Sequence, residues 1–284
     1  MVADAARVAH AGGGEDDLGR RVAVDGHRFL FRFADVQTRE LQGVLAALHQ
    51  GEGFVVVALG KVFPEDRGGF ARQRAVHKDR EVFVALDTAL GLDLAGHRFL
   101  IDCGMEQGRD VYENADLPCA PGTYEALLLT HAHIDHSGRI PYLYKNGYRG
   151  PIYTTDATRD LCAIMLEDSA HIQELEAEWK NRKAMRSGAE MIEPDYTVED
   201  AQNVMKQFVP CPYETWQTLF DGPTGKIEMR FTDVGHLLGS ASVSLRIAEP
   251  GRTPEIIVFS GDIGNTHQPP LSNVDCSTAL KSPI

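Results

Sequence analysis

The chain has 284 residues, of which 43% are hydrophobic and 24% are charged, so it can bury a sizeable core. Its longest apolar runs, such as Phe54–Leu59, are far too short to span a bilayer, and Met1–Asp4 does not begin a secretion signal. These features argue against a membrane-spanning or secreted protein. The five cysteines are scattered and lack C-x-x-C spacing, which favours reduced thiols in a cytoplasmic protein.

The net charge of −13 is unevenly placed along the chain. Residues 1–85 hold 12 basic and 12 acidic residues, so the whole acidic excess lies in residues 86–284. Such a balance is poorly suited to gripping a phosphate backbone, and it argues against nucleic-acid binding by this chain on its own. Carboxylates that face metal cations would explain part of the excess.

Residues 1–85 carry no recognisable chemistry, and we treat them as an N-terminal segment of uncertain structure. Arg21–Phe33 alternates around Asp25-Gly26, which predicts a hairpin. Leucines at helical spacing predict a helix over Asp35–His49, and Phe54–Leu59 predicts a buried strand. We expect the functional core to occupy residues 86–284.

In residues 86–284, short apolar strands run into polar loops. The predicted strands are Arg98–Ile101, Glu125–Leu129, Ile152–Thr155, Phe231–Val234, Val243–Ile247 and Ile256–Phe259, and the predicted helices are Ala157–Ser187 and Tyr196–Phe208. This recurrence of strand, loop and helix predicts a layered α/β domain.

The run His131-Ala132-His133-Ile134-Asp135-His136 directly follows one of these strands. On an extended backbone, His131 and His133 point the same way, and the turn after them can present Asp135 and His136 to a second ion. Zinc prefers imidazole and carboxylate ligands, and two metals about 3.5–4 Å apart can share a hydroxide. The run therefore predicts a dinuclear zinc site, because a merely polar loop does not account for four potential ligands in six residues.

Two later loops fit the same scheme. Gly235–Ser240 presents His236 after an apolar strand, and Ser260–Gly264 presents Asp262 after another. Each loop alone is more typical of a turn or a helix cap than of a metal ligand. Their position after the histidine run favours the ligand interpretation.

Asp102, the His131–His136 run, His236 and Asp262 together resemble the successive motifs of the metallo-β-lactamase superfamily. The flanks Thr130–Pro141 and Gly150–Tyr153 are similar to the β-CASP branch of RNA-processing nucleases. The resemblance covers about residues 95–270. It implies a metallo-β-lactamase αββα sandwich, partial here, with a divergent N-terminal segment.

The resemblance also implies roles for single residues. His131, His133 and His236 would hold one zinc, Asp135 and His136 the other, and Asp262 would bridge them. Asp102 would support the ligand loop, and Asp135 belongs to the expected catalytic centre. The implied reaction is hydrolysis of RNA phosphodiester bonds by metal-bound hydroxide. The assembly state is left open, with a homo-oligomer as one expectation.

The chain departs from the family pattern at both ends. Residues 1–85 do not match the strand and Gly-rich stretch with which family members open. Only 22 residues follow Asp262, so we expect the β-CASP domain to be missing and the second zinc site to lack a ligand. His267 is not expected to replace it, and the activity of such a chain is left open.

Two other functions stay in view. One is a small-ester hydrolase of the same fold, acting on a thioester or lactone; the acidic balance favours it, and the loops around Pro141 and Pro151 oppose it. The other is a metal-binding but catalytically incomplete fragment or scaffold. Outside the site, we expect His171 at the surface and Cys103 in the core. The Lys180–Lys183 run most simply solvates a helix face, yet it is the best local candidate for touching phosphate.

Overall fold

The computed structural model describes the backbone strands at residues 20–24, 27–31, 53–57, 73–77 and 80–85, and residues 89–106, 114, 117 and 119–264 with their side chains. The described chain forms two compact units. We call residues 69–212 with 238–240 the α/β unit, and residues 1–68, 213–237 and 241–284 the β unit. Strands from the first 85 residues take part in the sheets of both units.

The α/β unit is built on a seven-stranded sheet in the order β10-β9-β8-β7-β6-β5-β4. Strands β7 to β10 are parallel neighbours, whereas β4 to β7 pair in antiparallel fashion. The strands are β4 (Gln73–His77), β5 (Arg80–Ala85), β6 (Ala89–Leu94), β7 (His97–Ile101), β8 (Ala126–Leu128), β9 (Ile152–Thr154) and β10 (Phe208–Pro210). Because β7, β8 and β9 are parallel, their carboxyl ends lie along one edge of the sheet.

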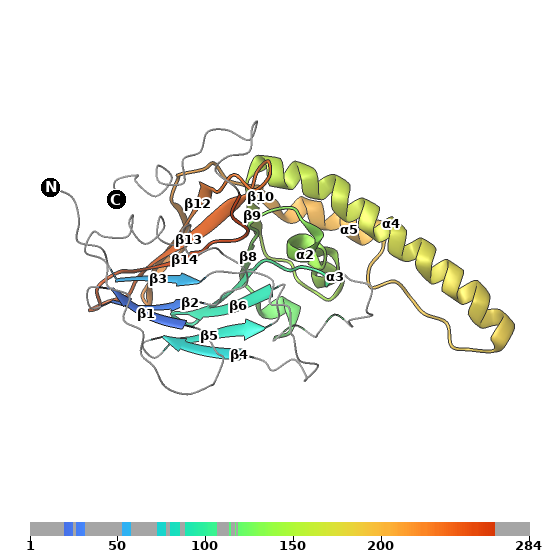
Figure 1. The fold of residues 1–284 in the computed structure, drawn as a ribbon, viewed down its shortest axis with the longest axis horizontal. Helices are drawn as coiled ribbons and strands as arrows, with labels where there is room; N and C mark the ends of the chain where they lie inside the picture. The colour runs from blue at the N-terminus through green and yellow to red at the C-terminus, as the bar shows by residue number, and fades with distance from the viewer. Residues whose placement is uncertain are drawn as a thin grey trace. The chain divides into compact units, whose positions relative to one another are not determined.

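The described α-helices of this unit (Figure 1) are α2 (Ile134–Ser137), α3 (Ile140–Lys145), α4 (Asp156–Ser187) and α5 (Val198–Val204), with 3-10 turns at Pro121–Thr123 and Met205–Gln207. Helix α4 begins at Thr155, whose hydroxyl accepts a hydrogen bond from the Thr158 N–H, and it ends at Gly188 with φ of 67°. Helix α5 opens with a reciprocal capping box between Thr197 and Asp200.

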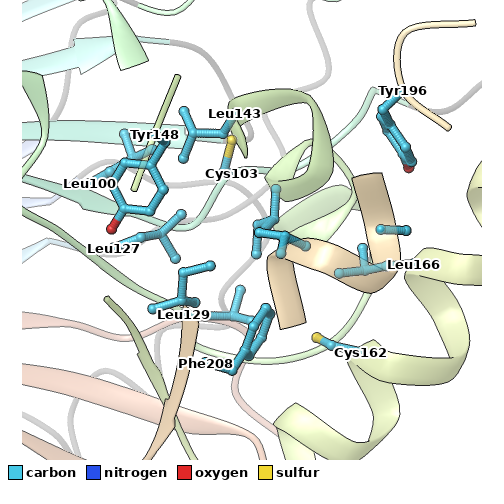
Figure 2. Packing of buried hydrophobic residues seen from close by; sticks show 14 of the residues in the cluster. Leu100, Cys103, Leu127, Leu129, Leu143, Tyr148, Cys162, Leu166, Tyr196 and Phe208 are labelled. Atoms are coloured by element: carbon cyan, nitrogen blue, oxygen red, sulfur yellow. The ribbon is translucent and has the colours of Figure 1, made fainter. Parts of the chain in front are cut away.

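The core of the α/β unit lies between the parallel strands and these helices. Figure 2 shows Leu100, Leu127 and Leu129 from the strand region near Leu143, Leu166 and Phe208. Cys103 and Cys162 belong to the same cluster, and burial raises the pKa of each thiol to about 12. Both thiols therefore stay protonated near neutral pH and act as small apolar groups, which confirms the core prediction for Cys103.

The β unit contains a five-stranded sheet in the order β11-β12-β13-β14-β3, antiparallel except for the β14–β3 pair, and a separate β1–β2 hairpin. Its strands are β1 (Arg20–Val24), β2 (His27–Phe31), β3 (Gly53–Val57), β11 (Gln217–Gly222), β12 (Gly225–Asp233), β13 (Ala241–Ala248) and β14 (Glu255–Phe259). Alternate residues of β12 are buried, namely Ile227, Met229 and Phe231.

Most predicted elements of the described chain are confirmed, including the hairpin around residues 25–26 and the mixed α/β class. One is wrong in extent. The predicted helix Tyr196–Phe208 ends at Val204, and Phe208–Pro210 instead pairs with β9. Proline disfavours helical backbone at the residue before it, so Val209 leaves the helix pattern and continues as a strand. The predicted helix Asp35–His49 and His267 lie outside the described residues.

Among the described residues, no helix is both long and apolar enough to cross a membrane.

Candidate metal centre

The histidine run lies at the carboxyl end of β8 in the α/β unit. Strand β8 is fully buried, and Thr130 and His131 follow it with exposed fractions of 1% and 0%. The backbone then turns at His133 into the short helix α2, which contains Asp135 and His136. Ser137 closes the turn by donating its hydroxyl hydrogen bond to the Ala132 and His133 carbonyls, at 2.9 and 3.1 Å. The run is therefore fixed at both ends.

Three imidazole rings of this loop lie next to one another. The Nε2 atom of His131 is 3.0 Å from Nδ1 of His133, and the rings of His131 and His136 have centroids 4.1 Å apart. Rings packed this closely with their nitrogens converging suit a shared cation, because imidazole is among the preferred ligands of zinc. Asp135 lies in the first turn of α2 beside them, half-buried.

Asp102 fixes the orientation of two of these rings through hydrogen bonds. It follows β7, is 2% exposed, and adopts a φ of 56°, which is uncommon for a residue other than glycine. Its carboxylate accepts hydrogen bonds from the N–H and the hydroxyl of Thr130, at 2.8 and 2.9 Å, and lies 2.8 Å from Nδ1 of His136.

The same carboxylate determines which ring nitrogens are available. Since the Thr130 hydroxyl donates its hydrogen bond to Asp102, the hydroxyl oxygen accepts a hydrogen bond from Nδ1 of His131, which lies 3.0 Å away. Nδ1 of His136 donates directly to Asp102. Protonation of both Nδ1 atoms leaves Nε2 of His131 and Nε2 of His136 with lone pairs for a metal. The sequence indicated Asp102 as a supporting residue, but the part played by Thr130 was not predicted.

A close backbone approach holds the loop with the candidate ligands His131–His136, here called the first ligand loop, against the end of β7. The Cys103 N–H donates to the His136 carbonyl at 2.7 Å, and the Met105 N–H donates to the Ile134 carbonyl at 2.9 Å. Between them, a Cβ atom on Gly104 would lie 1.6 Å from the Asp135 carbonyl oxygen. Only glycine therefore fits at position 104, and this requirement was missed from the sequence.

The β unit contains the two remaining candidate ligands. Nε2 of His236 lies 3.5 Å from the Asp262 carboxylate, and both side chains are partly exposed. The loop before His236 turns at Gly235, with φ of 66°, and the Asp233 carboxylate accepts its N–H at 2.9 Å. Thus the structure brings His236 and Asp262 together, as it brings together His131, His133 and His136 in the α/β unit.

The second ligand loop is supported in the same manner as the first. The Gly264 N–H donates to the Val234 carbonyl at 3.0 Å, and a Cβ atom on Gly264 would lie 2.1 Å from the Gly235 carbonyl oxygen. In both units, an Asp-x-Gly segment after a strand places its glycine against the peptide bond that precedes a candidate histidine ligand.

Two threonine hydroxyls at the start of α4 hold the end of the loop Gly235–Ser240. Thr155 and Thr158 donate hydrogen bonds to the Gly239 carbonyl at 2.6 and 2.8 Å, and all of these atoms are buried. A Cβ atom on Gly239, whose φ is 89°, would lie 2.5 Å from the Thr158 nitrogen. The loop segment Leu238–Ser240 is thereby part of the α/β unit.

Comparison with known proteins agrees with this arrangement. Residues 92–161 match the model of the metallo-β-lactamase superfamily, a range that includes Asp102 and the whole histidine run. Over this range the chain is similar to a metallo-β-lactamase superfamily domain. The resemblance stated from the motifs is confirmed.

The curated relatives extend the match over more of the chain. Ribonuclease TTHA0252 of Thermus thermophilus is 37% identical over 63% of this chain and 37% of its own length. The transcription termination factor FttA of Methanocaldococcus jannaschii is 33% identical over 58% of this chain and 23% of its own length. The chain thus spans well under half the length of either relative. A solved B3 metallo-β-lactamase with an active-site glutamic acid shares 16% identity over 68% of this chain and 65% of that chain, with a TM-score of 0.37.

Substituting Asp102 by asparagine is expected to weaken metal binding by about 10- to 100-fold, the range found when a residue that orients a ligand histidine is changed. Asparagine tolerates the left-handed backbone of position 102, but its amide cannot accept from His136 and Thr130 as a carboxylate does. Competition with a coloured chelator measures the affinity. Asp93→Asn is the matched control, because the Asp93 carboxylate pairs with Arg98 at 3.6 Å in a partly exposed position on β6. Equal affinities for the two variants would contradict the orienting role.

Proposed function

We propose that this domain is the metal-binding core of a hydrolase that cleaves RNA phosphodiester bonds. The observation that carries the proposal is the set of neighbouring imidazoles at the end of β8, in which Thr130 and Asp102 leave Nε2 of His131 and Nε2 of His136 available. Imidazole and carboxylate donors suit zinc better than magnesium or calcium, which prefer oxygen ligands. The RNA substrate is proposed from the ribonuclease relative, together with the flanking motifs of the histidine run.

In this proposal the ligands are the residues that the family motifs indicated. His131 and His133 would hold one metal with His236, Asp135 and His136 would hold the second, and Asp262 would bridge.

When bound, the metals would activate a water molecule and polarise the phosphate. The chain's own residues orient the groups that would bind these metals. Asp102 accepts a hydrogen bond from the Nδ1–H of His136 and, through Thr130, orients His131, so that both rings present a lone pair and cannot rotate away. Asp135 supplies a carboxylate at the edge of the cluster, where it can hold a metal or receive a proton.

A labelled single-stranded RNA provides the direct test, incubated with purified protein with and without a chelator. We expect cleavage that the chelator abolishes and that added zinc restores. A generic phosphodiester and a thioester run in parallel separate the alternatives. Zinc-dependent turnover of the thioester alone would favour the small-ester hydrolase, to which the acidic charge balance also points. Metal binding without turnover of any substrate would favour a catalytically incomplete fragment. The cytoplasmic location and a homo-oligomeric state stay predictions.

A further inference from the structure

The second half of helix α4 has one covered face and one exposed face. Ala177 and Ala184 are its buried residues there, and Asn181 lies between them on the same face. The Asn181 side chain both donates to the Ile192 carbonyl and accepts from the Ile192 N–H, each at 2.8 Å. The segment after Gly188 thus returns along this face, and helix α4 itself extends beyond α5 (Figure 1).

The opposite face presents a row of exposed side chains at spacings of three and four residues. We call this row the α4 ridge; it consists of Ile172, Leu175, Trp179, Arg182, Lys183 and Arg186. Trp179 is 59% exposed, and the Lys183 ammonium lies 5.8 Å from the centre of its ring. The ridge therefore begins apolar, carries an indole in its middle, and ends in three cations.

The charge of the ridge is opposite to that of the chain as a whole. Four of the 16 basic residues of the region 86–284 fall between Lys180 and Arg186, and the stretch from Trp179 to Ala189 contains no acidic residue. Lys180 lies on the flank of the helix, paired with Glu176 at 3.7 Å. Because the net charge is −13, a polyanion is repelled by most of this protein, and the ridge is a place at which it can be attracted.

We propose that the α4 ridge binds single-stranded RNA, with Trp179 stacking on a base and the three cations contacting the phosphates. Aromatic side chains beside a basic track are how single strands are bound without sequence preference. A second copy of the chain is the competing occupant, and loss of self-association in a ridge variant would reveal it. The choice of RNA as ligand builds on the proposed function, but ridge binding requires no metal.

The test uses the full chain, a labelled oligouridine RNA and fluorescence anisotropy in the presence of EDTA. We expect Trp179→Ala to weaken binding by about 5-fold or more, the lower end of a lost stacking interaction. Arg182→Glu with Arg186→Glu should weaken it further and reduce the slope of log affinity against log salt by about 1.4, at about 0.7 per lost phosphate contact. Lys206→Glu with Arg252→Glu changes the net charge equally at two other exposed positions and should have a much smaller effect.

A second measurement addresses the indole directly. In a Trp216→Phe background, Trp179 is the only tryptophan left, and RNA should quench its fluorescence. Unchanged anisotropy curves for both ridge variants, or an equal loss in the control variant, would overturn the proposal. So would a change from dimer to monomer in Trp179→Ala without any effect on RNA, since the ridge would then join two copies. Because the anisotropy assay contains EDTA, it measures RNA binding without any metal. RNA binding at the ridge without RNA cleavage would refute only the proposed function. Metal-dependent RNA cleavage without RNA binding at the ridge would refute only the ridge proposal.

Discussion

Replacing His131 by alanine is expected to weaken zinc binding by more than about 100-fold. Residues that merely orient ligands already contribute about 10- to 100-fold, and His131 is proposed to bind the metal itself. The ring is 0% exposed and fixed by Thr130, so no neighbouring side chain can take its place without moving the loop. RNA cleavage should fall with the metal content.

Metal analysis of the purified variant, followed by competition with a chelator, measures this effect. His171→Ala is the matched control, because His171 is an exposed histidine on α4, as the sequence predicted. Both variants lose one imidazole, and only the first loses one from the cluster. Equal zinc contents in wild type, His131→Ala and His171→Ala would contradict the assignment of the site.

Substituting Gly104 by alanine is expected to destabilise the protein by roughly 3 kcal/mol or more, the upper end of the range for overpacking. The new methyl group would meet the Asp135 carbonyl, which is backbone and cannot rotate aside. To relieve the contact, α2 must move away from β7, and this would break the hydrogen bonds of Cys103 and Met105 to the ligand loop. The melting temperature should fall by about 6 °C or more.

Thermal unfolding followed by circular dichroism, together with zinc content, tests the effect of Gly104→Ala. In the control Gly122→Ala, the nearest atom to the new methyl group is the Gly147 carbonyl oxygen at 3.5 Å, an ordinary contact distance. The control should keep both its melting temperature and its metal. If Gly104→Ala had the same melting temperature as the wild type, the loop would be able to shift at little cost in stability.

The sequence predicted the parts of the site whose members are neighbours in the chain. His131, His133, Asp135 and His136 fall within six residues after an apolar strand, so their chemistry can be read from local spacing. The family motifs then indicated His236 and Asp262, which local spacing alone left ambiguous. The α/β class followed from the same strand and loop pattern.

Contacts between distant residues could not be predicted in this way. Thr155 and Thr158 donate to a carbonyl more than 80 positions away, and Gly104 meets a peptide bond about 30 positions away. Neither leaves a periodic signal. The end of α5 was misplaced for a related reason, because pairing of Phe208–Pro210 with β9 outweighs the helical pattern before it.

The two Asp-x-Gly segments bear on the thermodynamics of metal uptake. Both ligand loops are held by backbone hydrogen bonds and by glycine contacts that involve no ligand atom. Metal binding therefore need not order these loops, and the conformational entropy of fixing them is lost when the chain folds. Preorganisation of this kind leaves more of the coordination energy to appear as affinity, and it predicts that stripping the metal removes activity well before it removes structure.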